Sequence, residues 1–264
     1  MNSERLLLID AHAHMSDKAF AGDLEAVLEA AVEVGVGAIV TVSEKLEDAQ
    51  RILDLAGRFP VLKPCIGLYP DTLDLEIAEA MVAFIRAHRD QLVGIGEVGL
   101  DHWVVKESTG WAIQEQAFAK FIALSKELDL PLNVHSRSAG RHTVRFLREH
   151  GAQKVLMHAF DGKASAALEG IEAGYYFSIP PSVVRSPQKQ KLLGHLPLDR
   201  LLLETDSPVL GPDPAVRNEP KNVLVSCQAV ASAKRVSVEE VARVTSENAR
   251  RLFPKAFSSC SNDS

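Results

Sequence analysis

The sequence predicts an α/β fold, specifically a (β/α)8 TIM barrel with additional C-terminal helices. Three observations support this prediction. Eight short apolar runs recur along the 264 residues, helical periodicity fills segments between them, and no Gly/Ser/Pro-rich linker divides the chain. Because a barrel of this kind takes about 250 residues, the length fits a single large domain.

The eight runs are rich in apolar and β-branched residues, which is typical of strands buried on both faces of a parallel sheet. They are Leu6–Ile9, Ala38–Val42, Val61–Leu68, Leu92–Val98, Leu130–Val134, Val155–Met157, Tyr175–Ile179 and Leu201–Leu203. Between them, apolar residues at 24–31 and 77–84 follow the i, i+3, i+4, i+7 spacing of a helix face. Strand and helix therefore alternate, and a doubly wound open sheet is the competing architecture.

Two further helices are expected after the eighth run. One covers residues 223–233, and the other opens at Ser237-Val238-Glu239-Glu240, which has the form of a capping box, and ends towards Phe253. We accordingly assign residues 1–257 to one barrel and residues 258–264 to a polar, frayed C-terminal tail.

Composition narrows the functional classes. The chain has 29 Lys and Arg against 35 Asp and Glu, a net charge of −6, so it has no broad basic field for nucleic acid or an anionic membrane. Cys65, Cys227 and Cys260 are too few and too far apart for a disulfide framework or a zinc ribbon, which favours a reducing compartment. No signal peptide or membrane span is expected. We expect a monomer inside the cell, cytoplasmic or nuclear, without a membrane or obligate protein partner.

Histidines and acids follow five of the predicted strands at their C-terminal ends, the face where barrel enzymes build their sites. These residues are His12, His14, Glu97, His135, His158 and Asp206. One such histidine alone is more often a hydrogen-bonded core residue, but six groups at the same end of different strands indicate a metal centre. His12 and His14 are two residues apart, so they point to the same side of a strand.

Four imidazoles and two carboxylates are more ligands than one catalytic ion usually takes. We therefore predict two divalent ions about 4 Å apart, with Glu97 as the bridging carboxylate. Mixed His and carboxylate ligation suits Zn, Mn, Co or Ni, and it disfavours Mg as the tightest occupant.

Cations also fall just beyond strand ends. They are Arg137, Arg141, Arg185, Arg217 and Lys221. Although any one of them could be a solvated surface residue, guanidinium groups match phosphate oxygens bidentately. A phosphodiester is therefore the substrate that fits best.

The ordered motifs of the chain resemble those of the TatD-type metal-dependent deoxyribonucleases. They are IDAHAH at 9–14, IGEVGLD at 95–101, NVHSR at 133–137, HAFDG at 158–162, LETDSP at 203–208 and RNEP at 217–220. The resemblance extends from about residue 6 to 257, and the segments at 134–141 and 177–182 look most similar to the third TatD-domain group of animals.

This resemblance implies a barrel hydrolase with two divalent ions that degrades DNA, often from the 3′ end, or cuts at abasic sites. One ion would take His12, His14, Glu97 and Asp206, and the other would take Glu97, His135 and His158. Arg137, Arg141, Arg217, Asn218 and Tyr69 would contact the substrate. The family usually has His where Gly67-Leu68-Tyr69-Pro70 has Tyr69, a departure that concerns substrate binding.

The predicted mechanism is two-metal hydrolysis, in which the ions hold the phosphate and activate a water. Asp206 is the expected general base, and Arg137 and Arg217 are expected to hold flanking phosphates. Asp10 is either an acceptor for a ligand histidine or a buried acid satisfied by backbone.

Two alternatives remain open. Barrel amidohydrolases share the His pattern and cleave amides, lactones or other esters, but many bridge their metals with a carboxylated lysine where this chain has Glu97. A non-catalytic metal-binding interaction protein would be expected to have a broken ligand set, and no ligand is missing here.

Overall fold

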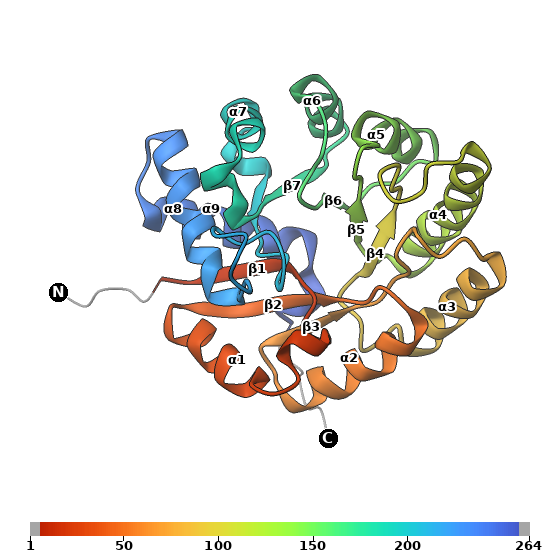
Figure 1. The fold of residues 1–264 in the computed structure, drawn as a ribbon, viewed down its shortest axis with the longest axis horizontal. Coiled ribbons are helices and arrows are strands. Elements are labelled where there is room, and N and C mark those ends of the chain that lie inside the picture. Colours follow the sequence, from red (N-terminus) through yellow and green to blue (C-terminus); the bar gives the residue numbers. More distant parts are fainter. Residues whose placement is uncertain (1–5, 259–264) are drawn as a thin grey trace.

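A sheet of eight strands stands at the centre of the molecule, with helices around it (Figure 1). The computed structural model describes residues 6–258, so Cys260 and nearly all of the predicted tail lie outside it. The strands are β1 (Leu8–Ala13), β2 (Val36–Val42), β3 (Leu62–Cys65), β4 (Ile95–Gly99), β5 (Leu132–His135), β6 (Val155–Met157), β7 (Tyr176–Ile179) and β8 (Leu201–Leu203).

All the paired strands are parallel, in the order β3-β2-β1-β8-β7-β6-β5-β4. The two ends of this order meet through backbone hydrogen bonds. Val93 N donates to Pro64 O at 2.9 Å, and Gly96 N donates to Ile66 O at 3.0 Å. The sheet is therefore a nearly closed barrel, which confirms the predicted fold over the open sheet.

Each strand is followed by a helix, as the alternating sequence pattern predicts. The helices are α1 (Leu24–Glu33), α2 (Leu46–Arg58), α3 (Leu75–His88), α4 (Ser108–Leu128), α5 (Gly140–Glu149), α6 (Ala164–Glu172), α7 (Pro187–His195), α8 (Val223–Lys234) and α9 (Val238–Leu252). The Ser237 hydroxyl accepts a hydrogen bond from Glu240 N at 3.1 Å, so the predicted N-cap of the last helix is present.

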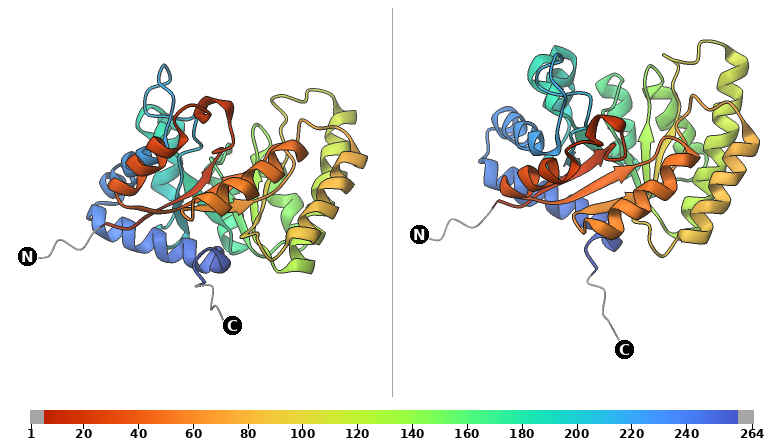
Figure 2. Two further views of the ribbon diagram at one scale, coloured as in Figure 1. Left: turned by 90° about the horizontal axis from the view of Figure 1, so that it is seen from below. Right: turned by 60° about the horizontal axis from the view of Figure 1, so that its bottom comes forward.

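Two apolar clusters hold these layers together. The larger joins the strands to the surrounding helices. The smaller joins residues of β1, β2, β6 and β8 to Leu252 and Phe253 at the end of α9. Figure 2 shows α9 passing beneath the strands, and Asn248 of α9 donates to Leu201 O at the start of β8 at 2.9 Å. Helix α9 thus covers the N-terminal end of the barrel and leaves the C-terminal end open.

The first strand lies later in the chain than predicted, at Leu8–Ala13 instead of Leu6–Ile9. The apolar pattern misplaced it because Asp10 and His12 are polar and yet fully buried within the strand. Asp10 accepts hydrogen bonds from the backbone N of Thr205 at 2.8 Å and from its hydroxyl at 2.5 Å. Among the helices of residues 6–258, none has the length and apolar character needed to cross a bilayer.

Candidate metal centre

Six His, Glu and Asp side chains converge at the open end of the barrel. His12 is in β1, His14 follows it, Glu97 is in β4, His135 ends β5, His158 follows β6, and Asp206 comes shortly after β8. The C-terminal ends of parallel barrel strands meet at one face, which brings these side chains together from distant parts of the sequence. Five of the six are buried, and His14 is partly buried.

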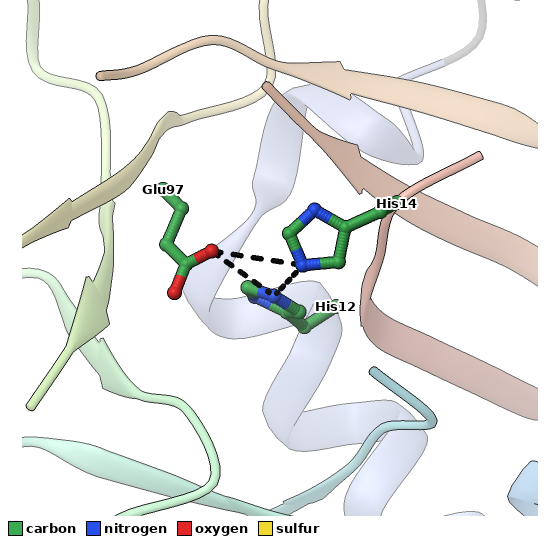
Figure 3. A group of neighbouring side chains, drawn as sticks. All are labelled: His12, His14 and Glu97. Atoms are coloured by element: carbon green, nitrogen blue, oxygen red, sulfur yellow. Dashed lines mark hydrogen bonds and ion pairs between the residues drawn. The ribbon is translucent and has the colours of Figure 1, made fainter. Parts of the chain in front are cut away.

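The first donor group surrounds His12 and His14, which point toward each other and toward Glu97 (Figure 3). Their Nε2 atoms lie 3.2 Å apart. Asp206 Oδ1 is 3.3 Å from His12 Nε2 and 3.2 Å from His14 Nε2. Glu97 Oε2 lies 3.8 Å and 3.6 Å from the same two nitrogens. Two nitrogens and two carboxylate oxygens thus face a common space.

The second donor group uses the other oxygen of Glu97. Its Oε1 lies 2.5 Å from His135 Nδ1 and 2.7 Å from His158 Nε2. The two ring nitrogens are 3.2 Å apart. The Glu97 carboxylate therefore stands between the two donor groups and offers one oxygen to each.

The chemistry of these donors fits a divalent cation. Ligands about 2.0–2.1 Å from a tetrahedral zinc are separated from one another by about 3.3 Å. The separations among His12, His14 and Asp206 are 3.2–3.3 Å, and the ring nitrogens of His135 and His158 are 3.2 Å apart. Imidazole nitrogen combined with carboxylate oxygen suits Zn, Mn, Co or Ni. Each pair of histidine nitrogens is 3.2 Å apart, close enough for both to bind one cation.

Two buried polar residues contact the outer nitrogens of candidate ligand histidines, and a third lies near another. His12 Nδ1 lies 2.9 Å from Asn133 Oδ1, and His135 Nε2 lies 2.9 Å from Asp101 Oδ2. Glu204 Oε2 lies 3.7 Å from His158 Nδ1, too far for a hydrogen bond. Such contacts fix the tautomer and direction of a metal-binding imidazole.

The structure gives the orienting role to Asn133 and Asp101, and of the two interpretations of Asp10 it supports the buried acid satisfied by backbone. Its carboxylate accepts from the backbone of His12 at 3.3 Å and from Thr205, while Asn133 contacts the His12 ring. The sequence carried a signal for Asn133, a polar residue in an otherwise apolar strand, and for Asp101 and Glu204, each in a motif with a ligand.

Electrostatics keep both acids of the centre ionised. Burial opposes this, but the imidazoles of His158 and His135 outweigh it and hold the pKa of Glu97 well below its ordinary value. Burial likewise opposes ionisation of Asp206, but hydrogen bonds from His12 and His14 hold its pKa below the ordinary range. For His14, burial is outweighed by the hydrogen bond to Asp206, which raises its pKa to about 9. Both carboxylates are therefore ionised, as the carboxylate ligands of a cation must be.

Gly99 allows β4 and β5 to approach each other beside the ligands. Its φ is +144°, which L side chains rarely adopt, and a Cβ there would meet the backbone oxygen of His135. The close approach places Glu97 in β4 next to His135 at the end of β5.

A pocket of about 410 Å³ opens over these ligands, a size typical of sites for small molecules. Tyr69 and Arg137, both predicted to contact substrate, line it, as do Glu44 and Lys189, which the sequence analysis missed. Lys189 donates to Ala159 O at 3.1 Å, and burial lowers its pKa. Burial also raises the pKa of Glu44.

Tyr69 is held in place by the metal centre itself. Its hydroxyl donates to Asp101 Oδ2 at 2.7 Å and lies 3.2 Å from His135 Nε2. Tyr69 therefore contacts both a candidate ligand and the carboxylate that orients it.

The three other predicted substrate contacts do not line this pocket. Arg217 forms ion pairs with Asp23 at 2.7 Å and Glu219 at 2.8 Å. The amide of Asn218 donates to two backbone oxygens, of Thr205 and Val209. Arg141 is exposed and donates to Ser165.

An eight-stranded barrel with clustered histidines and carboxylates at its C-terminal face defines a metal-dependent hydrolase. More narrowly, the chain belongs to the TatD family, since residues 9–254 match the family described as TatD related DNase.

Relatives and solved structures agree with this assignment. The chain is 46% identical over 260 residues to the deoxyribonuclease TATDN3 of Homo sapiens, covering 94% of this chain and 95% of the human protein. It is 36% identical over 256 residues to the uncharacterized metal-dependent hydrolase YabD of Bacillus subtilis, covering 94% and 99%. The crystal structure of YJJV, a TatD homologue from Escherichia coli K12, matches with a TM-score of 0.86 and 26% identity, covering 94% and 98%. The predicted likeness to the animal group is thereby confirmed, as is a hydrolase acting on ester bonds.

Proposed function

We propose that this chain hydrolyses the phosphodiester bonds of DNA with two divalent metal ions, as a 3′-exonuclease or as an endonuclease at abasic sites. The observation that carries the proposal is the position of Glu97, whose Oε2 faces His12 and His14 while its Oε1 faces His135 and His158. Two donor groups that share one carboxylate suit two cations bridged by it.

Different side chains of the site would bind the cations and transfer the proton. Divalent cations at the two donor groups would neutralise charge on the phosphate and acidify a water. Asp206 Oδ1 faces His12 and His14, so we assign Oδ2 to accept the proton of the attacking water and to return it to the leaving oxygen. The low pKa of Asp206 keeps this carboxylate ionised before the reaction.

Cations in the pocket support an anionic substrate. Arg137 and Lys189 line the pocket beside four acids, Glu44, Glu97, Asp161 and Asp206, so these two side chains together with the divalent ions would supply the positive charge that phosphate needs. We assign Arg137, Lys189 and Tyr69 to substrate contacts. Arg217 and Asn218 support the segment after β8 through their own bonds, and Arg141 is left as a contact for more distant phosphates.

The deoxyribonuclease relative in Homo sapiens supports DNA as the substrate. We propose action by a monomer inside the cell, in the cytoplasm or nucleus. The free, buried thiols of Cys65 and Cys227 fit such a reducing compartment.

A substrate panel tests the proposal. Metal-loaded wild type and Asp206→Ala are incubated with end-labelled single-stranded DNA, a duplex with an abasic site, and a set of carboxylic esters, lactones and amides. We expect cleavage of DNA by the wild type and a loss of at least about 100-fold in Asp206→Ala. If the wild type cleaves amides or lactones but no phosphodiester, the amidohydrolase alternative replaces the nuclease. Equal cleavage by both proteins contradicts the role of Asp206.

A further inference from the structure

One large aromatic side chain lies exposed beside the catalytic pocket. Trp103, in the connection between β4 and α4, is 55% exposed, although tryptophan is usually well buried. Two cations contact its ring: Lys106 Nζ lies 4.5 Å and the Arg137 guanidinium carbon 5.2 Å from its centroid. Arg137 also lines the pocket above the candidate metal ligands, so its side chain lies between the indole of Trp103 and this pocket.

The metal centre itself holds this tryptophan in position. Asp101 Oδ1 accepts hydrogen bonds from the backbone N of Trp103 at 2.7 Å and of Val104 at 2.8 Å. Asp101 Oδ2 contacts the ligand His135 at 2.9 Å. One carboxylate therefore connects the ligand to the segment that carries the exposed indole.

Neighbouring contacts fix the rest of this segment. His102 N donates to Arg137 O at 3.0 Å, which joins the connections that follow β4 and β5, adjacent strands in the sheet (Figure 1). The His102 ring stacks on Trp111 at 4.2 Å, and the Trp111 indole donates to Val105 O at 2.8 Å. Hydrogen bonds and stacking therefore fix the backbone conformation that leaves Trp103 exposed.

We propose that Trp103 is a stacking platform for one unpaired base next to the scissile phosphate, while Lys106 and Arg137 hold the adjoining phosphates. This inference rests on the proposed function and names its preferred substrate form, a single strand or a frayed end. Bases in a duplex stack on one another, whereas an unpaired base is free to stack on an aromatic ring. A base that occupies the ring takes the place of a cation, which is then free to contact phosphate.

The test separates binding of a base from chemistry at the metal centre. Wild type, Trp103→Ala and the matched control Trp103→Phe, which keeps an aromatic ring, are titrated with fluorescent oligothymidylate carrying hydrolysis-resistant phosphorothioate linkages. The same proteins hydrolyse a small phosphodiester without any ring, methyl 2,2,2-trifluoroethyl phosphate, followed by fluorine NMR; it reports on the metal centre and has nothing to stack on the indole. We expect Trp103→Ala to weaken oligonucleotide binding between about 5-fold and 100-fold, the range for base–aromatic stacking, and Trp103→Phe to restore most of it. Hydrolysis of the small ester stays within about 2-fold of wild type, because no phosphodiester-bound base is involved.

A direct spectroscopic readout complements the titration. In Trp111→Phe, Trp103 is the sole tryptophan of the chain. A base stacked on the indole quenches its fluorescence in step with binding. Abasic oligonucleotides, which lack a base to stack, bind with less quenching.

The outcomes distinguish failure of the platform from failure of the proposed nuclease function. Equal oligonucleotide affinity for wild type and Trp103→Ala overturns the platform, and so does a parallel loss of small-ester hydrolysis in Trp103→Ala, which would make Trp103 a support of the metal centre. If the wild type cleaves no DNA but binds it in a Trp103-dependent way, the nuclease proposal fails and the platform stands. Absence of any oligonucleotide binding overturns both.

Discussion

Asp101 links three functional parts of the molecule, so its replacement is a sensitive test of the site. Its carboxylate accepts from Tyr69 Oη at 2.7 Å, from Trp103 N at 2.7 Å and from Val104 N at 2.8 Å, and it contacts His135 Nε2 at 2.9 Å. Hydrogen bonds to Tyr69 and His135 help to hold its pKa below the ordinary range despite burial. We predict the effects of Asp101→Asn and Asp101→Ala from these four contacts.

The asparagine keeps the size of the side chain but removes its charge and presents an amide where His135 and Tyr69 need an acceptor. Replacing a partner that orients a metal ligand typically costs about 10- to 100-fold in metal affinity, and we expect this for Asp101→Asn. Asp101→Ala also leaves the N–H groups of Trp103 and Val104 without an acceptor. We expect it to lower the free energy of unfolding by roughly 2–4 kcal/mol.

Metal affinity is measured by competition with a fluorescent chelator, and the free energy of unfolding by urea titration of the metal-free proteins. Asp213→Asn is the matched control, because Asp213 is exposed and caps only a local turn at Ala215. Metal affinity of Asp101→Asn equal to that of wild type would refute the reasoning, since His135 would then bind metal without its carboxylate partner.

Three further predictions concern the pocket, the thiols and the metal. Lys189→Met removes a partly buried cation from the pocket and should lower kcat/KM for an oligonucleotide by about 10-fold or more, with KM carrying most of the change. An unaltered KM would exclude a phosphate contact. Burial raises the pKa of Cys65, and it raises the pKa of Cys227 to about 12. We therefore expect both thiols to stay protonated and unreactive towards thiol reagents at pH 8 until the protein unfolds. Mass spectrometry of labelled peptides measures this reactivity, and labelling of either thiol in the folded protein would contradict the prediction. Divalent metal at about 100 times its Kd should stabilise the fold by about 2.7 kcal/mol per site and raise the Tm measured by calorimetry. Glu97→Gln should largely remove this rise in Tm. An equal rise in Tm for both proteins would contradict the bridging role of Glu97.

Much of the fold is visible in the sequence because a parallel barrel repeats one local pattern. Apolar strands alternate with amphipathic helices, and the Ser237 cap marks the start of the last helix. The first strand was misplaced because Asp10 and His12 are buried by bonding partners distant in sequence. The periodicity of apolar residues along a segment does not show hydrogen bonds between residues far apart in the sequence.

The candidate site, like the fold, was predictable in part from the sequence. The convergence of the six candidate ligands was predictable because each lies near or just after the C-terminal end of a strand, and strand ends converge by topology. The position of Lys189 depends on how α7 packs over the pocket, which no spacing rule gives. Arg217 was expected at a phosphate, but its partner Asp23 is 194 residues away, so the sequence did not show that its guanidinium is already paired.

The central claim is that two cations bridged by Glu97 carry out DNA hydrolysis. Its most direct test adds a divalent metal stepwise to metal-free protein, at a protein concentration well above Kd, and measures the rate of hydrolysis of end-labelled single-stranded DNA at each step. The account predicts a rate that rises until two equivalents per chain are bound and then levels off. A plateau at one equivalent, or no hydrolysis at any loading, would contradict it.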